Sequence, residues 1–160
     1  MNNTIHSSGD FEGMRKAGNL AASTLDLLVE KVKPGVSTEE LDNIAFDYIV
    51  RHGGLIAPLF YKGYPKSVCT SINHVICHGI PSSRILENGD IVNIDVTVIV
   101  DGWHGDTSRM FPVGKINAKA QKLIDCTFQA MHEGINAAQP NATLGDIGSA
   151  IQTYAEKQNY

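Results

Sequence analysis

The chain has 160 residues, of which 42% are hydrophobic and 19% charged, and its formal net charge is −4 at neutral pH. These values are typical of a globular chain with room for one domain and a proper core, and they exclude a disordered or fibrous protein. A mildly acidic chain without a basic run is no dedicated nucleic-acid binder, and no apolar run is long enough to span a membrane.

The first third of the chain predicts two helices. Residues 10–33 place apolar side chains on one helical face, and Pro34-Gly35 should end that helix. Ser37 and Glu40 have capping-box spacing for a second amphipathic helix, which should run to Gly53-Gly54. The first stripe consists of Met14, Ala17, Ala21, Leu25, Leu28 and Val32, and the second of Leu41, Ile44, Ala45 and Tyr48.

The middle of the chain predicts a sheet. Short strands are expected at 56–60 and 67–73, and residues 91–111 predict a β-hairpin whose two-residue turn is Asp101-Gly102. One face of this hairpin should lie in the core, because its residues are β-branched or aromatic. That face carries Val92, Ile94, Val96, Val98, Val100, Trp103 and Phe111, and the polar face carries Asn93, Asp95, Thr97, His104, Asp106 and Ser108.

Two aspartates stand on the polar face of the predicted hairpin. Asp95 should lie opposite Ser108 and Asp106 opposite Thr97, so the aspartates are diagonal neighbours with Cβ atoms less than about 8 Å apart. Like charges this close repel each other unless a cation lies between them, and carboxylate oxygens suit a hard or borderline divalent ion. From the spacing alone, a metal site and a solvated polar face are equal alternatives.

The last third of the chain repeats the helical pattern of the first. Residues 117–138 predict a helix, Pro140-Asn141 ends it, and Thr143 with Asp146 caps another helix through Tyr154. A shift of 106 residues aligns Lys16 with Lys122, Pro34 with Pro140, Ser37 with Thr143, Leu41 with Ile147, and Tyr48 with Tyr154. The pattern indicates a duplicated α+β protein, with a first repeat at about 10–113 and the helical start of a second at about 117–160. Two unrelated helix pairs are the alternative.

Further candidate site residues lie between the predicted strands. His78 stands in a turn fixed by Gly79 and Pro81, where it could orient a substrate, transfer a proton, bind metal or simply bond to backbone. Upstream aromatic and thiol side chains could line an apolar pocket or belong to the ordinary core. These are Tyr61, Tyr64 and Cys69.

Several motifs together resemble the type I methionine aminopeptidases. The Tyr-Pro-Lys-Ser-Val-Cys and His-Gly-Ile-Pro sequences make the resemblance specific. The spacing of Asp95 and Asp106 alone would indicate only the wider pita-bread superfamily. The resemblance runs along nearly all of the chain. Its segments are 33–38, 64–73, 77–81, 88–95 and 104–108.

The resemblance implies a fold and a set of metal ligands. The family has a pita-bread (creatinase/aminopeptidase-like) α+β fold, in which sheet flanked by helices is duplicated, and residues 1–160 would form one truncated peptidase M24-like catalytic domain. Two divalent ions (Co, Mn, Fe or Zn) would be held by Asp95, Asp106, one histidine and two glutamates. The last three ligands are expected to have no counterpart here, because this sequence ends before the family motifs that carry them. The contexts of His132, Glu133 and Glu156 do not match those motifs.

The resemblance also implies roles around the metals. His78 matches the catalytic histidine that bonds to substrate near the scissile bond, and Tyr61, Tyr64 and Cys69 match the pocket for the methionine side chain. Pro58 stands at a pocket position that is often cysteine in bacterial relatives, so the pocket should differ slightly in shape.

The implied function is removal of the initiator methionine from nascent proteins with a small second residue. The substrates would be nascent N-termini near the ribosome, without nucleic-acid or membrane partners, and the full-length protein would be a monomer. A cytoplasmic location fits three cysteines without zinc-finger spacing and a first segment unlike a signal peptide. The alternatives are a proline-specific peptidase of the same superfamily, a non-catalytic peptide-binding protein of this fold, and a fragment inactive by itself.

Overall fold

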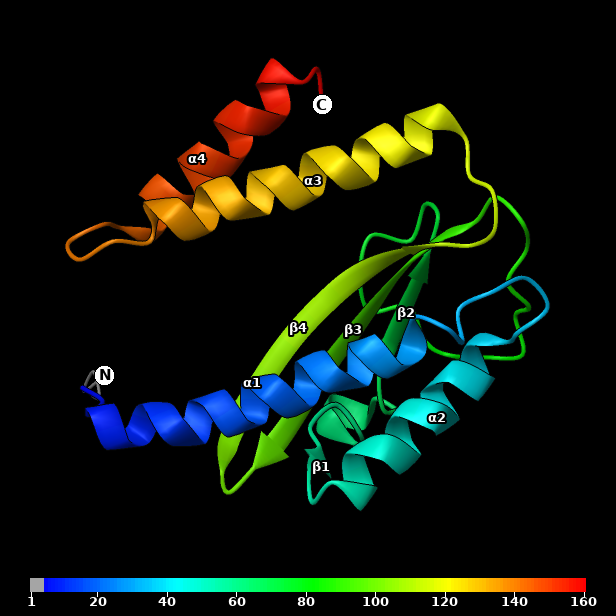
Figure 1. Ribbon diagram of the computed structural model, residues 1–160, viewed down its shortest axis with the longest axis horizontal. Coiled ribbons are helices and arrows are strands. Elements are labelled where there is room, and N and C mark those ends of the chain that lie inside the picture. The colour runs from blue at the N-terminus through cyan, green and yellow to red at the C-terminus, as the bar shows by residue number, and fades with distance from the viewer. Residues whose placement is uncertain (1–4) are drawn as a thin grey trace. The chain divides into compact units, whose positions relative to one another are not determined.

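The chain forms two compact units in the computed structural model, which describes residues 5–160 (Figure 1). The first unit, Met1–Ile116, combines helices and a sheet, and the second, Asn117–Tyr160, is a pair of helices. None of the described helices is both long and apolar enough to cross a membrane.

The first unit is built around one long central strand. Its elements are α1 (Ser8–Leu28), α2 (Thr38–Arg51), β1 (Leu55–Ile56), the 3₁₀ turn η1 (Tyr61–Gly63), β2 (Cys69–Ile72), β3 (Ile91–Val100) and β4 (Trp103–Pro112). Strand β4 pairs with β3 along its whole length, so β1 and β2 share the other edge of β3, and all pairs are antiparallel. This layout leaves one face of the sheet for the helices and the other for a site.

The predicted hairpin register is confirmed. Asp95 pairs with Ser108 and Asp106 with Thr97, and the turn residues Asp101 and Gly102 both have positive φ, as a type I′ turn requires. The hairpin therefore presents alternate residues to opposite faces, as the sequence indicated.

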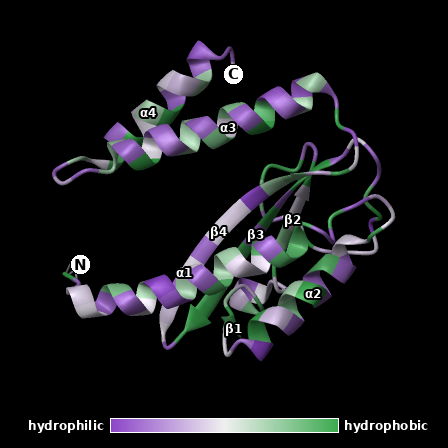
Figure 2. Cartoon of the chain, viewed as in Figure 1, coloured by the Kyte–Doolittle hydropathy of each residue, from purple (hydrophilic) through white to green (hydrophobic). Residues whose placement is uncertain are grey.

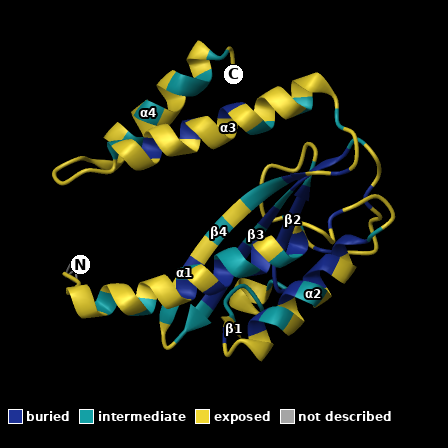
Figure 3. Cartoon of the chain, in the orientation of Figure 1, coloured by how far each residue is buried: buried dark blue, intermediate teal, exposed yellow. Residues whose placement is uncertain are grey.

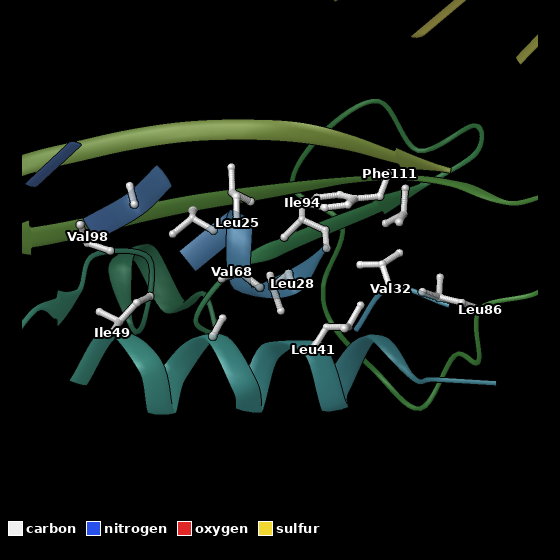
Figure 4. Packing of buried hydrophobic residues seen from close by; sticks show 14 of the residues in the cluster. Leu25, Leu28, Val32, Leu41, Ile49, Val68, Leu86, Ile94, Val98 and Phe111 are labelled. Atoms are coloured by element: carbon white, nitrogen blue, oxygen red, sulfur yellow. The ribbon is translucent and has the colours of Figure 1, made fainter. Parts of the chain in front are cut away.

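The core lies between the apolar face of the hairpin and the two helices. Leu25 and Leu28 of α1 and Leu41 of α2 pack with β3 side chains, among them Ile94, and all four are almost completely buried (Figure 4). Helix α1 approaches β4 so closely that a Cβ atom on Gly105 would collide with the backbone of Ala17. Glycine and alanine thus let the helix lie directly on the strand.

The first helix is shorter than predicted. It ends at Leu28 rather than Lys33, and Lys31 and Val32 both donate backbone hydrogen bonds to the Leu28 carbonyl in a tight turn. Val32 still reaches the core from this turn, whereas Met14, predicted to be in the apolar stripe, is 47% exposed. Pro34 disfavours helical backbone only in Lys33, the residue before it, so it does not explain why the helix ends already at Leu28.

The two short strands are also shorter than predicted, for two different reasons. After β1, Pro58 lacks a backbone donor and Phe60 adopts positive φ, so the chain turns into η1 instead of extending. Before β2, the backbone N–H groups of Ser67 and Val68 donate to the Asp42 carboxylate of α2. These two donors are therefore not available to a sheet ladder, and β2 begins at Cys69.

The second unit confirms the two predicted helices. Helix α3 (Ala118–Ala137) begins after the N-cap Asn117, and α4 (Leu144–Lys157) begins with the predicted capping box of Thr143 and Asp146. The inner faces of this pair form an apolar groove of about 410 Å³. Most of its lining lies at Thr127, Met131, Gly134, Ala138, Ile147 and Ile151.

The groove corresponds to the core of the first unit. Subtracting 106 from the lining positions above gives Ala21, Leu25, Leu28, Val32, Leu41 and Ala45, all of which are buried in the core cluster. The remaining lining residue, Ile135, is equivalent to Val29, which is exposed. The second unit has few buried residues (Figure 3). In α3 they are Cys126, Ala130 and Gly134, and α4 has none.

Candidate metal and substrate site

A cavity of about 860 Å³ opens on the polar face of the hairpin in the first unit. Its floor comes from β2, β3 and β4, and its walls come from residues 57–65 and 78–80. The cavity brings together all the site residues predicted from the sequence, which are Tyr61, Tyr64, Cys69, His78, Asp95 and Asp106. Pro58, Thr97 and His104 also line it.

Asp106 lies close enough to Asp95 to affect the ionisation of the Asp95 carboxyl. Asp95 is half-buried, and burial first, then the charge of Asp106 and a hydrogen bond to its side chain, raise the pKa of the Asp95 carboxyl. His78 acts in the opposite direction, because its positive form favours the Asp95 carboxylate. A second carboxylate at a partly desolvated position is unfavourable unless a cation compensates it.

The donor chemistry fits part of a metal site. Asp95 and Asp106 offer paired oxygen ligands, which hard and borderline divalent ions prefer. An ion between them would offset the repulsion that, after burial, contributes to the raised pKa of Asp95. Within residues 5–160, however, no group of three or more histidine, cysteine, aspartate or glutamate side chains is placed to hold a metal ion. A metal site at these two carboxylates would therefore need additional ligands.

His78 stands on a strained but firmly held turn. Its φ is 55°, a left-handed conformation that is costly for a residue with a side chain. The next residue, Gly79, donates its N–H to Ser71 Oγ at 3.2 Å and accepts from the Thr70 N–H at 2.8 Å. A Cβ atom at Gly79 would collide with the Thr70 carbonyl, so only glycine allows this close pairing. The imidazole of His78 is exposed at the cavity.

The pocket wall is neutral and partly apolar. Burial raises the pKa of the Cys69 thiol, so this group stays protonated at neutral pH. Burial also raises the pKa of the Tyr64 hydroxyl, which remains a hydrogen-bond donor. Tyr61 is largely exposed at the cavity mouth. Two aromatic rings and an uncharged thiol suit an apolar substrate side chain.

Sequence reasoning missed the residues that hold these loops. Asp42, which is only 4% exposed, fixes the start of β2 through Ser67 and Val68. Its position could have been noticed, because it falls between Leu41 and Ala45 on the buried face of a helix, where an unpaired carboxylate is unfavourable. Its partners lie 25 and 26 residues away and could not have been found from local spacing.

A second missed cluster holds both ends of the loop that carries His78. The buried Asp90 carboxylate accepts hydrogen bonds from Asn73 Nδ2 at 2.8 Å and Arg84 at 3.2 Å. In return, Asn73 Oδ1 accepts from the Ile91 N–H at 3.0 Å. These bonds fix the two ends of the loop against each other.

Comparison with known proteins identifies the class. The profile of metallopeptidase family M24 matches residues 12–160, and the chain therefore belongs to that family. Among its relatives, the methionine aminopeptidase of Rickettsia prowazekii is 58% identical over 156 residues, which are 98% of this chain and 60% of the relative. The methionine aminopeptidase of Escherichia coli K12 is 50% identical, with the same two coverages. The resemblance predicted from the motifs is confirmed.

The fold comparison agrees. The crystal structure of the R. prowazekii enzyme matches with a TM-score of 0.97 over 98% of this chain and 63% of that one, which confirms the pita-bread fold. An X-Pro aminopeptidase from Thermotoga maritima shares the fold with a TM-score of 0.82 at 15% identity. The chain spans about 60% of the length of the curated relatives that it matches.

Proposed function

We propose that this chain is the aspartate-bearing part of a methionine aminopeptidase, which removes N-terminal methionine from proteins with a small second residue. The main support is the juxtaposition of Asp95 and Asp106 with a neutral, partly aromatic pocket in one cavity. Similarity to enzymes of that name over 98% of the chain adds to it. The substrates would be nascent N-termini near the ribosome in the cytoplasm, and the full-length enzyme a monomer.

Each residue has a role in this proposal. Asp95 and Asp106 would hold two divalent ions, of Mn, Fe, Co or Zn, and neutralise part of their charge. Such ions, when bound, supply Lewis acidity for peptide hydrolysis. His78 would donate a hydrogen bond to the substrate and to negative charge developing on its carbonyl oxygen.

The pocket would select the substrate. The methionine side chain would be surrounded by Tyr61, Tyr64 and Cys69. Because the thiol and the aromatic rings are neutral, no unpaired charge from these residues would face the thioether sulfur. Pro58, which also lines the cavity, would adjust its shape.

The test uses a hybrid protein, in which residues 1–160 are joined to the part of the R. prowazekii relative that follows the matched portion. With Mn or Co, the hybrid should hydrolyse Met-Ala-Ser much faster than an X-Pro peptide. A preference for X-Pro would indicate a proline-specific peptidase, and absence of both metal and turnover would favour a non-catalytic peptide-binding protein. Residues 1–160 alone should show no turnover, because two carboxylates do not hold two divalent ions in useful geometry.

A further inference from the structure

We infer that the Tyr64 hydroxyl is a positioning group for His78, so that one side chain both lines the pocket and holds the substrate-binding histidine in place. The inference rests on the proposed function for its kinetic consequence, and on the geometry of the first unit for its mechanism. Tyr64 was predicted only as part of the pocket wall, and its hydroxyl adds a contact outside that wall.

The first observation is that the hydroxyl lies within hydrogen-bond distance of two carbonyl oxygens. Tyr64 Oη lies 2.9 Å from the Val68 carbonyl oxygen and 3.1 Å from the Gly79 carbonyl oxygen, and its single proton is shared between these two acceptors. Val68 belongs to the segment that follows Tyr64, whereas Gly79 directly follows His78. The hydroxyl therefore joins the pocket segment to the histidine turn.

The second observation is that both partners are themselves fixed. The Val68 N–H donates to Asp42 at 3.1 Å, so this end of the bridge is anchored to α2. The Gly79 carbonyl also accepts from the Thr70 N–H at 2.8 Å, so Tyr64 satisfies the second lone pair of that oxygen. A half-buried hydroxyl between two fixed carbonyls defines one position for the turn.

The third observation is the strain at His78. A left-handed histidine persists only when its surroundings determine the backbone. Gly79 receives that support from β2 on one side and from Tyr64 on the other. Without the hydroxyl, the β2 contacts remain, so the turn should stay folded but sample more than one conformation.

This arrangement predicts different effects from the ring and the hydroxyl. Tyr64→Phe keeps the ring in the pocket and removes only the bridge. In the hybrid protein it should lower kcat about 5- to 10-fold, as expected for one buried hydrogen bond, with KM changed less than about 2-fold. Tyr64→Ala should raise KM as well, because it also removes the pocket wall.

A double-mutant cycle tests whether Tyr64 acts through His78. If it does, Tyr64→Phe should have no further effect on kcat in a His78→Ala background, because the positioned group is gone. The same loss in both backgrounds, or a change confined to KM, would overturn the inference. Tyr48→Phe is the matched control: it removes a hydroxyl from a half-buried tyrosine of α2 that does not line the cavity, and kcat should be unchanged.

A second measurement is independent of activity and uses residues 1–160 themselves. In Tyr64→Phe, the amide signals of His78 and Gly79 should shift in ¹H–¹⁵N spectra, and the amides of Thr70 and Gly79 should exchange at least about 10-fold faster. Tyr48→Phe should leave these signals in place. Unchanged spectra and exchange would overturn the bridge even in an active enzyme. If the hybrid lacks methionine aminopeptidase activity, the proposed function fails and the spectra alone decide the bridge.

Discussion

The two helix pairs of this chain follow the same sequence pattern, but only one is packed against a sheet within its own unit. Leu25 of α1 is 1% exposed, whereas Met131, which is 106 residues later at the equivalent position of α3, is 43% exposed. Ala45 of α2 is completely buried, and its equivalent Ile151 of α4 is 38% exposed. Hydrophobic patches recur on all four helices in Figure 2.

This difference in burial shows that helix formation depends on local sequence, whereas burial of the apolar faces does not. Caps and apolar stripes determine where the helices form, and they do so in both units. Burial depends on a partner with a complementary face, which β3 supplies in the first unit. Stability and chemistry should accordingly be concentrated in the first unit, and the following substitutions test that expectation.

The largest contrast should come from core truncation. Leu25→Ala removes a buried side chain and should lower the free energy of unfolding by about 2–5 kcal/mol, whereas Met131→Ala should cost less than about 1 kcal/mol. Urea unfolding measures both. Trp103, the single tryptophan, packs against Gly13 in the first unit, so its fluorescence reports that unit, and circular dichroism reports all helices. Similar losses at the two positions would contradict the comparison.

The next largest effect should be the loss of turnover when His78 of the first unit is replaced. His78→Ala should lower kcat of the hybrid protein by about 10²–10³-fold, because a donor to developing charge is lost. Metal content should stay nearly intact, since the proposed role of His78 is to contact the substrate and not to bind an ion. Metal analysis together with kinetics checks this. Loss of metal in parallel with activity would make His78 a ligand and this role wrong.

A smaller contrast pairs two other equivalent positions. Asp42 of α2 is buried and accepts two backbone hydrogen bonds, and its equivalent in α4 is Gly148, around which there is open space. Asp42→Ala should cost about 1.5–3 kcal/mol, because two buried donors lose a charged acceptor. Gly148→Ala should stabilise α4 by about 0.5–1 kcal/mol, because alanine loses less backbone entropy. Thermal unfolding of both variants measures the opposite signs.

The smallest expected effect is the pH dependence of the helix caps. It should be equal in the two units, because each cap depends only on neighbouring residues. Hydrogen bonds from Ser37 lower the pKa of Glu40, and those from Thr143 lower the pKa of Asp146. A carboxyl with a depressed folded-state pKa contributes stability above its unfolded pKa and loses it as pH falls through the folded value. The protection factors of the amides in the first turns of α2 and α4, which correct for the slower intrinsic exchange at low pH, should therefore fall together from neutral pH to about pH 3. Glu40→Gln and Asp146→Asn should remove that pH dependence, and a dependence in only one unit would show that the caps are not equivalent.

The sequence predicted the parts that short-range signals determine. Asp101-Gly102 set the hairpin register, and with it the common face of Asp95 and Asp106. The capping boxes predicted where α2 and α4 begin. In these cases the residues that decide the structure are close to one another in the chain.

Parts that depend on distant contacts were not predictable in this way. The late start of β2 depends on Asp42, and the turn at His78 depends on Tyr64, 15 residues from its partner Gly79. The loop after β1 contains non-glycine residues with positive φ at Phe60 and Lys62, which no turn motif marked. The pocket position of Tyr61 and Tyr64 came from the family resemblance, and the residues alone left an ordinary core as an alternative.

The central claim is that Asp95 and Asp106 are metal ligands, and calorimetric titration of the metal-free hybrid protein with Mn²⁺ tests it most directly. The account predicts that Asp106→Ala binds at least one ion fewer than the parent and has no measurable turnover, because a carboxylate that offsets the charge of the ions is lost. Tyr48→Phe, outside the cavity lining, should bind as the parent does. Unchanged metal stoichiometry and normal rates in Asp106→Ala would contradict the claim.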